Sequence, residues 1–284
     1  MSQYFKLAED FARLLEAGKH LPLGNFPPQS RPAVAAEAPV ALIFSPHPDD
    51  EVIIGGLALR LLREADWRII NVAVTQGSNR TRQAARWNEL RDCCKNIGFE
   101  LVATAPQGLE KINLKTRQAD PRHWEGCVAV IAGLLRQHAP RAIFFPHDND
   151  WNSSHIGTHH LVVDALNTLP DFSTCTIETE FWAAMTTPNL MVELNAQHLG
   201  SLMTALSFHV GEVQRNPYHL SLPAWMSDNV RRGSEIVGGQ GGVAPDFTFA
   251  TLYRLRQWQQ RGFVDCQPGG RTLACGVSAA DLFA

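Results

Sequence analysis

The amino-acid sequence predicts an α/β fold with an open, mostly parallel sheet and helices on both of its faces. Short apolar runs that are typical of buried strands recur between residues 40 and 190. Longer segments lie between these runs, and their apolar residues repeat at helical spacing. Alternation of this kind indicates parallel strands joined by helical crossovers. Beyond residue 195 the alternation fades, which predicts a loop-rich C-terminal part.

The elements follow in order along the chain. Residues 1–20 predict an amphipathic helix with Leu7, Phe11 and Leu14 on one face, and a connection rich in proline and alanine follows over 21–37. Strands are predicted at 40–45, 68–75, 100–105, 142–146 and 177–186. Helices are predicted at 50–64, 81–97, 122–138 and 156–169, and one more follows residue 195. Residues 217–242 are expected to be mainly loop.

These elements predict one Rossmann-like domain spanning residues 1–284. Its core would cover about 40–190, and residues 195–284 would form a C-terminal elaboration. A length of 284 residues suits a single domain with a large core. The sequence leaves both a monomer and a homo-oligomer open.

Composition excludes several classes of partner. A formal net charge of −3 and a pI near 6.4 give no basic surface for nucleic acid. No apolar stretch approaches the roughly 18 residues of a membrane span, and the first residues lack the charged-then-apolar order of a signal peptide. The six cysteines include no C-x-x-C pair and are expected to be reduced core thiols. The sequence therefore predicts a cytoplasmic protein.

A cluster of metal-binding residue types follows the first predicted strand. Residues 46–51 read Pro-His-Pro-Asp-Asp-Glu, with His47 held between two prolines and Asp49 and Asp50 at the turn into a helix. Catalytic zinc usually has three protein ligands and one water, whose pKa falls to about 7. One aspartate can therefore bind the metal while the other acts as the base. The simpler alternative is that the acidic residues only suit a helix N-terminus.

A second cluster, from His147 to His160, follows the strand at 142–146. Ligands of open α/β sheets bind outside the carboxyl ends of the strands, so we expect the two clusters to meet. His147, His155 and His159 are rival ligands, and His155 and His159 share a helix face. The alternative for any one of them is a capping or loop side chain.

The stretch His47-Pro48-Asp49-Asp50-Glu51 resembles the signature of the PIG-L/LmbE family of zinc-dependent N-acetylglucosamine-conjugate deacetylases. The resemblance implies that His47 and Asp50 bind zinc and that Asp49 is the general base. It also implies a third ligand at the end of an H-x-D-H element, which points to His155. Asn152 and Ser154 stand where that element has its first histidine and its aspartate.

Because of these two replacements, other residues must polarise the substrate carbonyl and transfer protons. Asn152 can donate a hydrogen bond to a developing oxyanion. The family's pair of aspartate and histidine is thus absent from the H-x-D-H element. His147, Asp148, Asp150 or His159 could supply the proton transfers expected of that pair.

Two further positions are candidates for binding substrate. Arg86-Trp87-Asn88-Glu89 resembles a family R-x-x-E pair whose arginine contacts sugar hydroxyls, although an ordinary i,i+3 ion pair is the alternative. The segment ending at His209 resembles a family helix that ends near the site, and a core histidine explains it equally well.

The resemblance implies a hydrolase that removes an N-acetyl or N-acyl group from a small-molecule amino-sugar conjugate through a zinc-activated water. The expected metal ligands are His47, Asp50 and His155, and the expected catalytic residues are Asp49, Asn152 and His147. Fe²⁺ could occupy the same site. Two alternatives stay open: a non-haem Fe(II) enzyme that uses the same facial triad, and a catalytically altered amino-sugar-binding protein.

Overall fold

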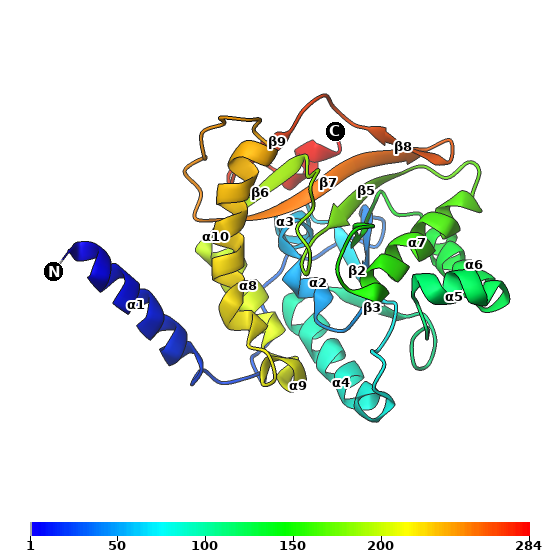
Figure 1. The fold of residues 1–284 in the computed structure, drawn as a ribbon. Coiled ribbons are helices and arrows are strands. Elements are labelled where there is room, and N and C mark those ends of the chain that lie inside the picture. The colour runs from blue at the N-terminus through cyan, green and yellow to red at the C-terminus, as the bar shows by residue number, and fades with distance from the viewer. Residues whose placement is uncertain (1) are drawn as a thin grey trace.

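The computed structural model describes residues 2–284 and shows a mixed sheet covered by helices on both faces (Figure 1). The strands are β1 (Val40–Ser45), β2 (Arg68–Ala73), β3 (Glu100–Ala103), β4 (Ala142–Pro146), β5 (Thr174–Thr179), β6 (Leu190–Leu194), β7 (Phe249–Gln259), β8 (Gly262–Asp265) and β9 (Arg271–Leu273). Their order is β3-β2-β1-β4-β5-β7-β6-β9, and β8 pairs with β7. Strands β3, β2, β1, β4 and β5 are parallel, and β7 runs antiparallel to both of its long neighbours.

The helices form two layers. They are α1 (Gln3–Gly18), α2 (Asp50–Ile53), α3 (Gly56–Glu64), α4 (Arg80–Ile97), α5 (Leu114–Ala119), α6 (Pro121–His138), α7 (Ser153–Asn167), α8 (Ala196–Leu206), α9 (Val210–Val213), α10 (Tyr218–Ile236) and a 3₁₀ turn at Ala279–Leu282. Side chains of α3, α4 and α8 pack in one hydrophobic cluster, and those of α6 and α7 pack in another. The predicted α/β architecture, with helices on both faces, is confirmed.

Strand β1 lies at the centre of the sheet because both of its faces are apolar. Ala41 and Ile43 belong to the cluster on one face, whereas Leu42 and Phe44 belong to the cluster on the other. β1 pairs with β2 on one side and with β4 on the other, so the strand order reverses there. Such a switch point opens a crevice at the carboxyl ends of the two strands, where ligands of this kind of sheet bind.

The helix predicted over 50–64 is two helices, α2 and α3, and the break follows the acidic cluster directly. Gly55 lies at the break, where a Cβ would approach the Glu51 carbonyl oxygen to 2.6 Å. The hydroxyl of Tyr253 on β7 bridges the break. It donates to the Ile54 carbonyl at 2.6 Å and accepts from the Leu57 amide at 3.0 Å. A residue about 200 positions away therefore sets where α2 ends, which local spacing does not reveal.

The prediction of a loop-rich segment over 217–242 is wrong, because α10 occupies most of it and packs against β7. Leu222, Met226 and Val230 recur every four residues and are buried. Pro223 and the glycines that follow the helix obscured this spacing in the sequence. The short helix α5 was not predicted from the sequence either.

The fifth predicted strand is shifted toward the N-terminus. It was expected over 177–186, but β5 covers Thr174–Thr179. The chain therefore leaves the sheet at Glu180, and Phe181 and Trp182 lie beyond the carboxyl end of the strand instead of within it. This shift brings aromatic side chains to the edge where the two predicted clusters meet.

Helix α1 has the predicted position, but its apolar face is not packed against the domain. Leu7, Phe11 and Leu14 are 66%, 51% and 71% exposed, and Figure 1 shows the helix extending away from the sheet. No helix in residues 2–284 is long and apolar enough to cross a membrane.

The cysteines match the expected thiols only in part. All six are free, and Cys93, Cys94, Cys127 and Cys175 are buried. Cys266 is exposed and Cys275 is half-buried, so these two are not core thiols.

Candidate metal centre

The structure brings His47, Asp50 and His155 together at the carboxyl ends of β1 and β4. His47 and Asp50 lie in the turn from β1 into α2, and His155 lies in the first turn of α7. Nδ1 of His47 is 3.5 Å from Oδ2 of Asp50, and Nε2 of His155 is 3.3 Å from the same oxygen. One potential ligand atom from each residue lies within 4.8 Å of the other two. Two segments about a hundred residues apart therefore form one cluster.

This cluster fits a divalent metal ion. Nε2 of His155 is buried and has no hydrogen-bond partner, which is unusual for a buried polar atom. Tetrahedral zinc with bonds of about 2.0–2.1 Å separates its ligand atoms by about 3.3 Å, close to the two distances above. Two imidazoles and one carboxylate are also a donor set that zinc commonly takes.

The charged groups of the cluster shift one another's pKa values. Burial opposes the charged form of Asp50, yet the adjacent His155 and His47 hold the pKa of this carboxyl below its usual range. Burial also opposes protonation of His155, but Asp50 and Asp150 raise the pKa of this imidazole to about 10. A carboxylate that stabilises an imidazolium proton can equally stabilise a cation, and metal binding releases that proton.

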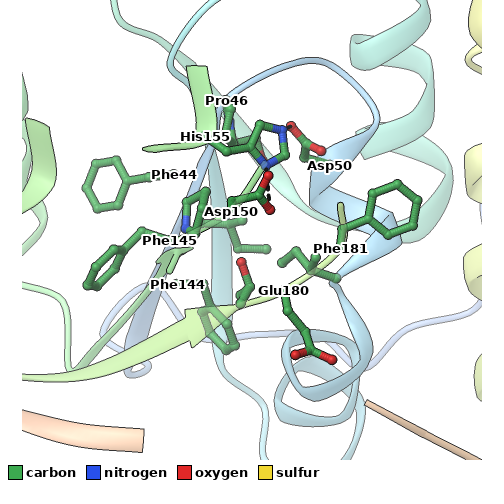
Figure 2. Close-up of a pocket in the computed structure, with 14 residues that line it drawn as sticks. Phe44, Pro46, Asp50, Phe144, Phe145, Asp150, His155, Glu180 and Phe181 are labelled. Carbon is green, nitrogen blue, oxygen red and sulfur yellow. Dashed lines mark ion pairs between the residues drawn. The ribbon is translucent and has the colours of Figure 1, made fainter. Parts of the chain in front are cut away.

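Asp150 lies on the other side of the His155 ring, so that His155 stands between two carboxylates (Figure 2). Its Oδ2 is 3.7 Å from Nδ1 of His155 and is buried without a hydrogen-bond partner, while its Oδ1 accepts from the Asn152 amide at 2.8 Å. A carboxylate beside the second nitrogen of a ligating histidine fixes the tautomer and orientation of the ring. The sequence suggested Asp150 only as a source of protons, and its geometry makes it a partner of His155.

We expect Asp150→Asn to weaken zinc binding by about 10- to 100-fold, because the amide cannot hold the His155 ring as a carboxylate does. A competition titration with a chromophoric chelator measures this affinity. Asp148→Asn is the matched control, since Asp148 is exposed in the same loop. Equal affinities for wild type and Asp150→Asn would contradict the role given to Asp150.

Asp49 is held in a strained conformation beside the cluster. Its φ of 113° is in a region that non-glycine residues rarely adopt. The Asp49 amide donates to the buried Glu51 carboxylate at 2.9 Å. Nε2 of His209 lies 2.7 Å from that carboxylate, and the Cys93 thiol donates to it at 3.2 Å. Glu51 therefore organises the turn that places Asp49.

The Asp49 carboxyl lies next to an arginine. Nη2 of Arg86 is 3.8 Å from Oδ2 of Asp49 and donates to the Pro48 carbonyl at 2.8 Å. Burial, together with the charge of Asp50, raises the pKa of the Asp49 carboxyl well above its usual range. A carboxylate with this surrounding is suited to accept a proton from a nearby water.

An open cavity adjoins these residues. It is lined by His47, Asp49, Asp50, Ile53, Arg86, Asn152, Phe181, Trp182, Glu212, Arg215 and Tyr218. The buried Glu212 pairs with Arg82, Arg86 and Arg215, which fixes α9 and the following residues against α4. The predicted metal ligands thus lie beside a space that can admit a small molecule.

A family model described as PIG-L: GlcNAc-PI de-N-acetylase matches residues 42–166. This range contains His47, Asp50 and His155. Residues 42–166 are therefore similar in sequence to the PIG-L family. The matched part contains β4 and all of β1 except its first two residues. No curated protein matches the chain significantly.

Several solved structures share the fold of this chain. N,N′-diacetylchitobiose deacetylase from Pyrococcus horikoshii is 16% identical, with 87% of this chain and 92% of that chain covered and a TM-score of 0.56. The A40926 pseudoaglycone deacetylase is 12% identical, with 79% and 98% covered and a TM-score of 0.55. The 4-carboxy-2-hydroxymuconate hydratase GalB from Pseudomonas putida is 16% identical, with 76% and 95% covered and a TM-score of 0.54. At these identities the likeness shows the fold alone.

Two of the other predicted residues lie at the cavity. Arg86 and Asn152 both line it. Asn152 is the N-cap of α7, and its Oδ1 accepts from the Ser154 amide at 2.9 Å. Its side-chain oxygen is therefore occupied by the helix.

The other predicted histidines lie away from the cavity. His209 is fully buried behind Glu51. Nε2 of His147 lies 3.0 Å from the Ala183 carbonyl oxygen, and Nδ1 of His159 lies 3.0 Å from that of Pro146. None of the three lines the cavity, and His147 and His159 stand outside the three-residue cluster.

Several residues of the site were not predicted from the sequence. The sequence did not predict that Glu51, which belongs to the motif at residues 47–51, contacts His209. Four lining residues from the C-terminal half had no local signal: Phe181, Trp182, Arg215 and Tyr218.

Proposed function

We propose that this protein is a metal-dependent deacetylase that removes an N-acetyl or other N-acyl group from an N-acetylglucosamine-type conjugate by hydrolysing a linear amide bond. The observation that carries the proposal is the convergence of His47, Asp50 and His155 beside a cavity lined by Asp49. The match to a de-N-acetylase family and the likeness to deacetylases of known structure support it.

His47, Asp50 and His155 would hold the metal, and Zn²⁺ suits this donor set best, with Fe²⁺ as an alternative. The bound ion supplies Lewis acidity and lowers the pKa of water to about 7. Asp49 lies beside the ligands and accepts the proton of the attacking water. The Asn152 amide group donates to the developing oxyanion, and Arg86 holds hydroxyl groups of the sugar.

The departing nitrogen needs a proton before the amine leaves. His147 was the candidate from the sequence, but its Nε2 faces the Ala183 carbonyl. Asp49, protonated in the first step and lining the cavity, is better placed to return that proton. Asp49 would therefore act first as base and then as acid.

The proposed function is tested by release of free amine from simple N-acetylglucosaminides. We expect zinc-loaded protein to liberate amine and acetate in equal amounts, and chelator-treated protein to do so only after zinc is restored. Amine is measured with fluorescamine and acetate by an enzyme-coupled assay. No amine from any N-acyl glucosaminide, or release that a chelator leaves unchanged, would contradict the proposal. Oxygen consumption by the iron-loaded protein would instead favour the non-haem iron alternative.

A further inference from the structure

Three aromatic side chains, which we call the aromatic rim, lie together beside the cavity: two of them line it, and the third contacts one of these two. They are Trp151 from the loop before α7, Trp182 from the loop after β5 and Tyr218 from the first turn of α10. The ring centroids of Trp151 and Trp182 are 6.3 Å apart, and those of Trp182 and Tyr218 are 5.8 Å apart. Segments from three parts of the chain therefore present one aromatic surface.

The rim is exposed above a packed base. Trp151 is 78% exposed and Trp182 is 42% exposed, although tryptophan is usually highly buried. Beneath them, Phe181 contacts Trp182, Tyr218 and Trp225 with centroid separations of 5.1, 5.9 and 5.4 Å. These edge-to-face contacts fix the base, while both tryptophan side chains keep solvent-exposed surface.

The rim is continuous with the reacting centre. Trp182 and Tyr218 line the same cavity as His47 and Asp49, and Trp151 directly precedes Asn152, which also lines it. A substrate whose amide lies at Asp49 would extend past these rings on its way to solvent.

We propose that the aromatic rim is a subsite for a ring attached to the amino sugar, bound by stacking of its face on Trp151 and Trp182. This inference rests on the proposed function and names the class of conjugate: one whose next group is a flat or chair-shaped ring. Indole faces favour contact with apolar ring faces and π-systems, and few polar groups are then needed to orient the ligand. A second pyranose and an aromatic aglycone share this chemistry.

Three substrates with the same N-acetyl group test the subsite. They are the methyl and 4-nitrophenyl N-acetyl-β-D-glucosaminides and N,N′-diacetylchitobiose, and the last two distinguish an aromatic ring from a sugar ring. We expect kcat/KM of at least one ring-bearing substrate to exceed that of the methyl glycoside by about 5-fold or more, mainly through KM. Trp151→Ala should bring this ratio close to one, and Trp151→Phe should restore most of it.

Phe5→Ala is the matched control, because Phe5 is an exposed aromatic residue on α1, apart from the cavity. It should keep the wild-type ratio. Equal ratios in wild type and Trp151→Ala would overturn the subsite while leaving the proposed function intact.

A binding measurement separates the two proposals. Isothermal titration calorimetry of zinc-loaded Asp49→Asn with the same three compounds reports binding without turnover. Tighter binding of a ring-bearing compound that is lost on adding Trp151→Ala would support the subsite even if no amine were released by the wild type, and the proposed function alone would then fail. Equal binding of all three compounds would overturn the subsite.

Discussion

Asp49→Asn is expected to lower the rate of amide hydrolysis by about 100-fold or more while leaving bound zinc unchanged. Asparagine has nearly the same size and keeps the backbone amide that donates to Glu51, so the turn should be preserved. Its side chain cannot accept a proton from water. The substitution should therefore slow the chemical step without affecting metal binding.

The measurement is kcat with an N-acetylglucosaminide, together with zinc content by atomic emission. Asp171→Asn makes the same chemical change at an exposed position outside the cavity lining and should behave as wild type. Wild-type turnover in Asp49→Asn would remove the base role from Asp49. Loss of zinc in that variant would show instead that the residue helps to form the metal site.

His155→Ala should abolish both zinc binding and turnover. Of the three proposed donors, His155 is the one from the second segment, and its removal leaves only His47 and Asp50 on the turn after β1. Zinc per chain should fall from about one ion to near zero, since catalytic zinc usually needs three protein ligands.

The control for this variant is His160→Ala, a half-buried histidine on the same helix that is outside the cluster. It should keep both its zinc and its activity. Full zinc content in His155→Ala would move the third ligand to His147 or His159, against the backbone contacts that both make here.

The centre of the fold could be predicted because its signals are local. β1 and β4 are short apolar runs buried on both faces, and each is followed at once by histidine and carboxylate. Once parallel strands are assigned, the carboxyl ends of neighbouring strands meet at one edge of the sheet. The proximity of His47, Asp50 and His155 follows from that rule.

The residues that hold the metal-binding motif in place could not be predicted, because they contact it from distant parts of the sequence. Glu51 and His209 are 158 positions apart, and Tyr253 reaches the break between α2 and α3 from β7. Nothing near His209 in the sequence shows that it packs behind the motif and not in the cavity. The role of Asp150 could not be predicted either, because it depends on the orientation of the His155 ring.

The aromatic rim was missed for a related reason. Val, Ile, Thr and aromatic residues are enriched in strands, so the sequence predicts a strand that includes Phe181 and Trp182. β5 instead ends at Thr179, and it pairs with β7, a strand that local alternation did not predict. Tyr218 lies at the start of α10, where the proline and the polar residues suggested a loop.

Anomalous diffraction at the zinc edge, from crystals grown with zinc, tests the central claim most directly. The proposed site predicts one strong peak within about 2.0–2.2 Å of Nδ1 of His47, Oδ2 of Asp50 and Nε2 of His155, with Asp49 next to the open coordination position. The same peak should be missing from crystals of His155→Ala. A zinc ion bound by other residues, or a wild-type site without a peak at saturating zinc, would contradict the account.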